Sequence, residues 1–119
     1  MSYVDGFVLP VPKKNLPAYK RLAVKAGKIW KEYGALDYKE CAADDLNVPM
    51  CLPFTKIVKL KAGETIMFSY IVYKSRAHRD RVNAQVMKDP RLMKMCDPKK
   101  MPFDCNRMAY GGFKAIVEW

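Results

Sequence analysis

The stretch TIMFSYIVY (residues 65–73) decides the fold, because it is apolar on both of its sides. Side chains alternate between the two faces of a strand. One face carries Met67, Ile71 and Tyr73, and the other carries Phe68, Tyr70 and Val72. A run of β-branched and aromatic residues on both faces predicts a central strand of a sheet.

The segments around this strand predict two main helices and three further strands. A helical apolar period runs over residues 13–33, with Asn15 as the expected N-cap and Gly34 ending the helix. Ser75 is expected to cap the second helix, and Pro90 to end it. The predicted elements are a strand over 4–11, a helix over 13–33, an edge strand over 35–42, a short helical turn or an irregular arm over 54–61, the central strand over 65–73, a helix over 76–88, one further turn over 91–96 and a last strand over 107–117.

This βαββαβ order predicts the ferredoxin-like fold, an α+β class in which two helices cover one face of a four-stranded antiparallel sheet. The 119 residues suit one domain over 1–119. Two helices leave the face with Phe68, Tyr70 and Val72 uncovered, and a lone soluble chain seldom exposes so large an apolar patch. A second subunit, the bases of a nucleic acid or a ligand would cover it.

The composition excludes a disordered chain and a membrane-spanning one. Hydrophobic residues make up 50% of the sequence, and no apolar run approaches the ~18 to 20 residues of a membrane helix. Residues 1–6 have neither the basic nor the apolar part of a secretory signal. The 22 Lys and Arg outnumber the 12 Asp and Glu, which gives a formal charge of +10. We expect a cytoplasmic protein that does not bind membranes.

The four cysteines do not predict a metal site. Cys41, Cys51, Cys96 and Cys105 form no Cys-x-x-Cys pair, and the single histidine, His78, is far from them in sequence. A zinc site needs about four ligands at workable spacing. We predict free thiols in a reducing compartment, no metal and no cofactor, with disulfides 41–51 or 96–105 as the alternative.

His78 is the candidate general base, because histidine titrates near neutral pH. It also shares a helical stripe with Val82 and Val86, and a packed, structural histidine is the interpretation we favour. A ligand pocket between helices and sheet is expected to be lined by Trp30, Tyr70, His78, Asn83 and Tyr110.

Asp5 is a carboxylate among the apolar residues of the first strand, and a charge in such a place needs a partner. Arg107 begins the predicted neighbouring strand. We therefore predict an Asp5–Arg107 ion pair, either structural or holding an anionic ligand through the free side of the guanidinium.

The hexapeptide FSYIVY (68–73) imitates an aromatic motif of RNA-recognition domains, with Phe68 and Tyr70 as stacking platforms. The basic residues of the first helix, however, are expected on the side remote from that face. Nucleic acid is therefore not the expected partner, and the same aromatic face suits a subunit interface.

Several segments of the chain resemble the YbaA-like family, small bacterial proteins that carry a domain of unknown function. The segments are YVDGF (3–7), KEYGAL (31–36), ETIMFSY (64–70), DPR (89–91) and, most specifically, MPFDCNRMAYGGF (101–113). The resemblance implies the fold of the dimeric α/β-barrel superfamily, in which two ferredoxin-like subunits pack sheet to sheet. It implies no particular activity.

Together, these patterns predict a homodimer in which Phe68, Tyr70 and Val72 form the contact. We expect each subunit to bind or turn over a small organic molecule, without metal or nucleotide. The alternatives are an RNA-binding module that uses Phe68 and Tyr70, and a non-catalytic dimeric structural or stress protein.

Overall fold

The computed structural model describes residues 1–119 and contains four strands and three helices. In chain order these are β1 (Tyr3–Pro12), α1 (Leu16–Glu32), β2 (Asp37–Ala42), β3 (Glu64–Tyr73), α2 (Arg76–Met87), α3 (Pro90–Met95) and β4 (Ala109–Lys114). Single turns of 3-10 helix lie at Lys13–Asn15, Phe54–Lys56 and Cys105–Arg107. The predicted order is confirmed, and the fold is ferredoxin-like α+β.

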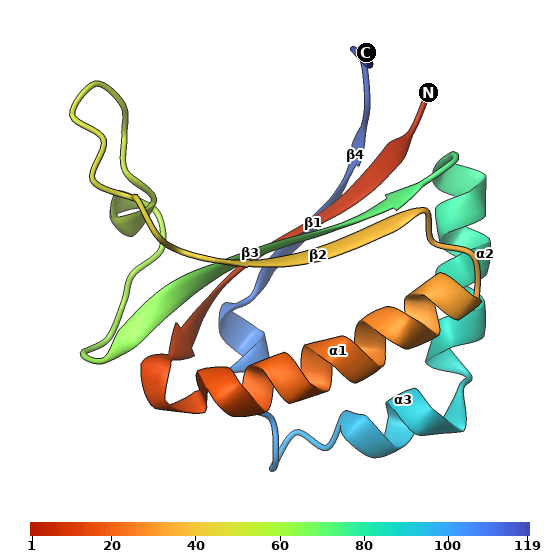
Figure 1. Cartoon of the computed structure of the whole chain (residues 1–119), viewed down its shortest axis with the longest axis horizontal. Coiled ribbons are helices and arrows are strands. Elements are labelled where there is room, and N and C mark those ends of the chain that lie inside the picture. Colours follow the sequence, from red (N-terminus) through yellow and green to blue (C-terminus); the bar gives the residue numbers. More distant parts are fainter.

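The four strands form one antiparallel sheet in the order β2-β3-β1-β4. The central strands β1 and β3 pair with Gly6 opposite Tyr70, and β4 pairs with β1 so that Gly111 is also opposite Gly6. The strand β2 lies at one edge, with Glu40 opposite Ser69 of β3. All three helices lie on the same side of this sheet (Figure 1). The strand that is apolar on both faces is therefore central, as predicted.

The core lies between the sheet and the helices. Alternation along the strands directs Leu9, Val11 and Ile71 toward the helices, and each is at most 3% exposed. Val82 and Val86, one turn apart on α2, are at most 1% exposed. Complete burial of such a side chain contributes roughly 1.5–3 kcal/mol, so this packing supplies the main force that holds the helices on the sheet.

The opposite side of the sheet, which we call the open face, has no helix over it. Strand alternation places on it the side chains of Val4, Val8, Phe68, Tyr70, Val72 and Phe113. Phe68 is 45% exposed and Phe113 is 63% exposed. At one end of this face Ile66 is buried, and the segment 43–63 lies on this side of the sheet (Figure 1). The middle of the open face is apolar and uncovered, and Lys39 and Asp37 lie at its β2 edge.

Two local predictions about turns are confirmed. Gly34, which follows α1, has a positive φ of 116°, a conformation that favours glycine. The hydroxyl of Ser75 accepts a hydrogen bond from the backbone N–H of His78, so Ser75 caps α2.

Two others hold only in part. Asn15 takes the N-cap position of α1, but its side chain makes no capping hydrogen bond, because a 3-10 turn leads into the helix and already gives Asn15 a helical backbone. Its amide instead donates to the carbonyl oxygen of Pro102, 3.0 Å away. The last strand is shorter than predicted, since residues 105–107 form a 3-10 turn before β4 begins.

Gly27 allows α1 to approach the edge strand β2 closely. A Cβ atom at this position would lie 2.9 Å from Cδ1 and Cε1 of Tyr38. Tyr38 cannot move away freely, because its hydroxyl donates to Glu40 at 2.7 Å. The missing side chain of Gly27 therefore sets the distance between α1 and β2.

We predict that Gly27→Ala destabilises the protein by about 1 kcal/mol, because the steric cost of about 1–3 kcal/mol exceeds the helix-propensity gain of about 1 kcal/mol. Urea unfolding measures the change. Lys28→Ala, at the exposed neighbouring position, is the control and should change stability by less than about 0.5 kcal/mol. A Gly27→Ala protein more stable than the wild type would contradict this account.

Candidate ligand cavity

A cavity of about 370 Å³ lies between the sheet and the helices. Of its 21 lining residues, 17 are hydrophobic, so its walls suit an organic molecule better than a solvated ion. The walls come from all four strands and all three helices and from the segment 96–108, which contributes Met101 and Phe103. The polar groups gather in two clusters, one around Asp5 and one around Glu40.

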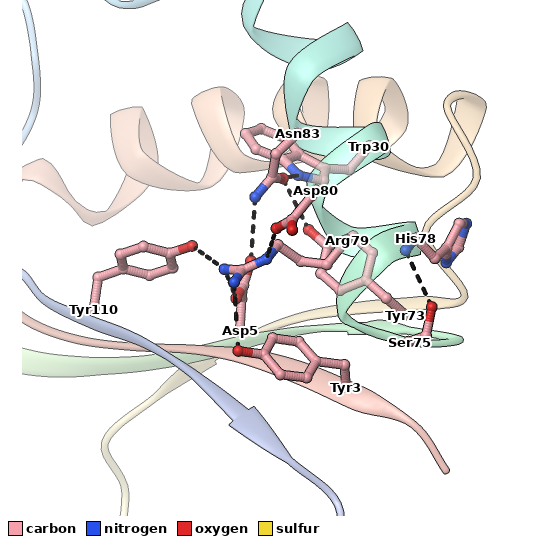
Figure 2. A network of polar contacts seen from close by, with 10 residues as sticks. All are labelled: Tyr3, Asp5, Trp30, Tyr73, Ser75, His78, Arg79, Asp80, Asn83 and Tyr110. Carbon is pink, nitrogen blue, oxygen red and sulfur yellow. Dashed lines mark hydrogen bonds and ion pairs between the residues drawn. The ribbon is translucent and has the colours of Figure 1, made fainter.

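The first cluster is built on Asp5, in the central strand β1. Its side chain is 1% exposed. Nη1 of Arg79 donates to Oδ1 of Asp5 at 2.8 Å and to the hydroxyl oxygen of Tyr110 at 2.9 Å (Figure 2). The guanidinium carbon of Arg79 also lies 4.9 Å from the centre of the Tyr3 ring. Arg79 therefore neutralises the buried carboxylate and ties α2 to β1 and β4.

Asn83, one turn after Arg79 on α2, extends this cluster to α1. Its Oδ1 accepts hydrogen bonds from the Trp30 indole at 3.0 Å and from the Tyr73 hydroxyl at 3.1 Å. Its Nδ2 points toward Oδ2 of Asp5 at a distance of 3.4 Å (Figure 2). Because the amide uses its acceptor and a donor at once, its orientation is fixed. Both oxygens of Asp5 thus have donors.

The surroundings of this cluster raise the pKa of both Arg79 and Tyr110. Burial is the largest single effect on Arg79 and disfavours the charged guanidinium, but Asp5, Tyr110 and Tyr3 together outweigh it, and the pKa of Arg79 is raised. Burial, followed by the negative charge of Asp5, raises the pKa of Tyr110. The hydroxyl of Tyr110 is therefore protonated at neutral pH, and it is a neutral hydrogen-bonding group on the cavity wall.

The second cluster is built on Glu40 of β2. Oε1 accepts a hydrogen bond from the Tyr19 hydroxyl and Oε2 accepts one from the Tyr38 hydroxyl, both at 2.7 Å. Burial and the nearby Glu40 carboxylate raise the pKa of both tyrosines well above the ordinary value. The two hydroxyls are therefore fixed as donors, and they hold the carboxylate at the cavity wall.

Three of the predicted lining residues, Trp30, Asn83 and Tyr110, do line the cavity. Tyr70 does not, because strand alternation places it on the open face with Phe68, where their ring centres are 6.3 Å apart. Lys39 lies over its ring, 5.9 Å from the centre.

His78 also lies outside the cavity (Figure 2). It sits in the first turn of α2, where Nδ1 accepts a hydrogen bond from the backbone N–H of Lys74 at 3.0 Å. Its ring packs edge to face against Tyr73, with centres 5.9 Å apart. Burial, followed by the charges of Lys74 and Arg81, lowers its pKa. This is a structural environment, in which the neutral ring serves as an acceptor.

The predicted Asp5–Arg107 ion pair is wrong. The antiparallel register places Asp5 opposite Gly112, so Arg107 lies near the other end of β1. Arg107 instead pairs with Glu64, with nitrogen–oxygen distances of 2.6 and 2.9 Å. It also donates to the carbonyl oxygen of Lys59 at 2.7 Å. Arg107 therefore ties the segment before β3 to the turn before β4.

Four residues of the two clusters were not among the predicted lining residues: Arg79, Glu40, Tyr38 and Tyr19. Two signals could have found most of them. Arg79 and Asn83 are four residues apart, so they share a helix face. Tyr38 and Glu40 alternate along β2 on the side that faces the helices. The pairing across elements depends on the register, which residue patterns alone do not give.

The structure offers no group of three or more His, Cys, Asp or Glu side chains that could hold a metal ion. All four cysteines are unpaired and exposed, so neither of the alternative disulfides is formed. None of the helices is both long and apolar enough to cross a membrane.

The fold and the cavity define a class: ferredoxin-like proteins with an apolar chamber under the helices. The family model described as "Protein of unknown function (DUF1428)" matches residues 2–105, and the chain belongs to this family. It is 42% identical over 118 residues to "Uncharacterized protein YbaA" of Escherichia coli strain K12, with 99% of each chain covered. The resemblance to YbaA-like proteins is thus confirmed.

Solved structures support the same fold at low sequence identity. A dimeric ferredoxin-like protein from an uncultured marine organism matches with a TM-score of 0.57 and 11% identity, covering 100% of both chains. SnoaB, a cofactor-independent oxygenase from Streptomyces nogalater, matches with a TM-score of 0.56 and 12% identity, covering 98% of this chain and 95% of its own.

We predict that Asp5→Asn destabilises the protein by about 3 kcal/mol, because the largely buried guanidinium of Arg79 then keeps only the exposed carboxylate of Asp80 as a counter-charge. A double-mutant cycle with Arg79→Met should give a coupling energy above about 1 kcal/mol in urea unfolding. The matched cycle with Arg107→Met should give additive changes. Coupling of position 5 to position 107 and not to position 79 would contradict the network.

Proposed function

We propose that this protein binds or turns over a small organic molecule in the cavity between its helices and its sheet. The observation that carries the proposal is the cavity itself, an apolar chamber with polar groups confined to two clusters. The apolar part of such a molecule would fill the middle of the cavity, and the two clusters would orient its polar groups. Carboxylate, amide and phenol groups supply this recognition without a metal or a nucleotide.

For turnover, the groups that face the cavity are the ones to consider. Tyr110 presents a protonated hydroxyl that is oriented by Arg79, and such a group can donate a hydrogen bond to a ligand oxygen. SnoaB is named a cofactor-independent oxygenase, so a fold of this kind supports chemistry without a cofactor in at least one protein. His78 is not proposed as the base, since it lies outside the cavity.

We predict that the neutral apolar dye N-phenyl-1-naphthylamine binds in the cavity and gains fluorescence there. Ala26→Phe would fill the space beside Trp30 on α1 and should weaken dye binding at least about tenfold, which corresponds to about 1.4 kcal/mol. Fluorescence titration measures this, with circular dichroism as the check on folding.

The matched control is Ala84→Phe, which adds the same ring at an exposed position of α2 outside the cavity. It should leave dye affinity unchanged. Equal dye binding by wild type and Ala26→Phe would refute a cavity-bound ligand.

We also propose that two copies assemble through their open faces into a dimeric α/β barrel, in the cytoplasm. The exposed rings of Phe68 and Phe113 support an interface, because a patch of this kind is usually covered. A structurally similar protein is described as dimeric. Four free thiols suit a reducing compartment.

The RNA-binding alternative would use the same aromatic face, and we do not favour it. Of the lysines near that face, Lys39 is already paired with Asp37 at 2.9 Å. The largest group of basic residues lies on α1, on the other side of the sheet. A structural dimer without a ligand, in turn, would make no use of the cavity.

We predict that Phe68→Glu converts the dimer to a monomer at micromolar concentration, because it places a charge in the middle of the apolar interface. Sedimentation velocity should show twice the 13.7-kDa chain mass for the wild type and one chain mass for the variant. Val24→Glu, at a 66% exposed position of α1, is the control and should remain dimeric. A monomeric wild type would overturn the proposed assembly.

A further inference from the structure

The carboxylate of Glu40 is the one charge on the cavity wall without a counter-charge. The only other acidic residue that lines the cavity, Asp5, is paired with Arg79. Glu40 forms no ion pair, and its two hydrogen-bond partners are the neutral hydroxyls of Tyr19 and Tyr38. Glu40 is half-buried, and a negative charge on a largely apolar wall is stabilised when a positive group pairs with it.

Each oxygen of Glu40 keeps room for a further hydrogen bond. A carboxylate has about four acceptor positions, and the two tyrosines use one on each oxygen. Because both hydroxyls donate to Glu40, they leave no donor for a ligand acceptor. This end of the cavity therefore favours a ligand that donates hydrogen bonds.

The two tyrosines that hold the carboxylate each pack against a further aromatic ring. Tyr19 packs edge to face against Phe103 with ring centres 5.6 Å apart, and Tyr38 lies beside Trp30 with centres 6.4 Å apart. All four of these residues line the cavity with Glu40. Aromatic faces attract cations, and the attraction is largest where water is excluded. A carboxylate among aromatic rings is a suitable place for an ammonium group.

We infer that the ligand of this cavity is an apolar amine, whose protonated nitrogen pairs with Glu40 and whose hydrocarbon body extends toward Tyr110. This rests on the proposed function and narrows its ligand class. Among the lining residues, the charge of Asp5 is balanced by Arg79, and the second carboxylate on Arg79, Asp80, is 60% exposed and does not line the cavity. The cavity as a whole therefore selects a single positive charge.

Three lysines line an outer groove that Glu40 also reaches, and they do not remove this preference. Lys20, Lys28 and Lys31 line a separate groove on the outside, between α1 and the edge of β2, which Glu40 and Asp37 also reach. None of these lysines pairs with Glu40. An amine in the outer groove would meet three positive charges, whereas an amine in the cavity would meet none that is uncompensated.

The test uses three probes of matched size, 4-phenylbutylamine, 4-phenylbutan-1-ol and 4-phenylbutyrate, titrated calorimetrically at neutral pH, where the amine is protonated. We expect the amine to bind at least about tenfold more tightly than the alcohol, and the carboxylate to bind most weakly. Glu40→Gln keeps the shape and an acceptor for the tyrosines. This substitution should lower the affinity for the amine about tenfold and change the affinity for the alcohol by less than about twofold.

Asp37→Asn removes an acid from the same strand that reaches only the outer groove, and it should leave all three affinities unchanged. Equal binding of amine and alcohol to the wild type overturns the inference, while alcohol binding leaves the proposed function standing. A loss of amine binding in Asp37→Asn also overturns it, because the ligand would then lie in the outer groove. If none of the probes binds, the proposed function fails and this inference with it. Should Glu40→Gln not fold, the comparison of amine with alcohol on the wild type decides.

Discussion

The rest of the structure depends on the pairing of the buried Asp5 carboxylate with side chains of α2. A charge in the central strand, 1% exposed, must be matched within the fold, and its partners Arg79 and Asn83 both come from α2. Asn83 in turn holds Trp30 of α1, and Arg79 holds Tyr110 of β4. One carboxylate thus fixes the relative positions of two strands and two helices, and it keeps polar groups at a place where apolar side chains would otherwise close the core.

The cavity lies between this cluster and the one at Glu40. Each cluster needs its own hydrogen-bond partners, so neither can collapse into the apolar space between them. Gly27 sets how closely α1 approaches β2, and the segment 96–108 supplies the remaining apolar wall. The two clusters differ in charge, because Asp5 is balanced by Arg79 and Glu40 has no basic partner. Because of this difference, a ligand with one positively charged end would lie in the cavity with that end at Glu40.

The fold was largely predictable, because it depends on patterns that neighbouring residues reveal. The apolar faces of residues 65–73 placed β3 in the centre, and the helical period of residues 13–33 placed α1. The site was less predictable. Trp30, Asn83 and Tyr110 were found, but the partner of Asp5 depends on the register of β1 and β4, which places Arg107 too far along the strand. Tyr70 could have been excluded by strand alternation alone, because it shares a face with Phe68.

The space between helices and sheet is thus a chamber for a ligand, kept open by two polar clusters. A high-resolution crystal structure of the protein as purified tests this most directly. We expect electron density for an organic molecule or ordered water between the Glu40 carboxylate and the Tyr110 hydroxyl. A core in which Trp30, Met101 and Phe103 close together and fill that space would contradict it.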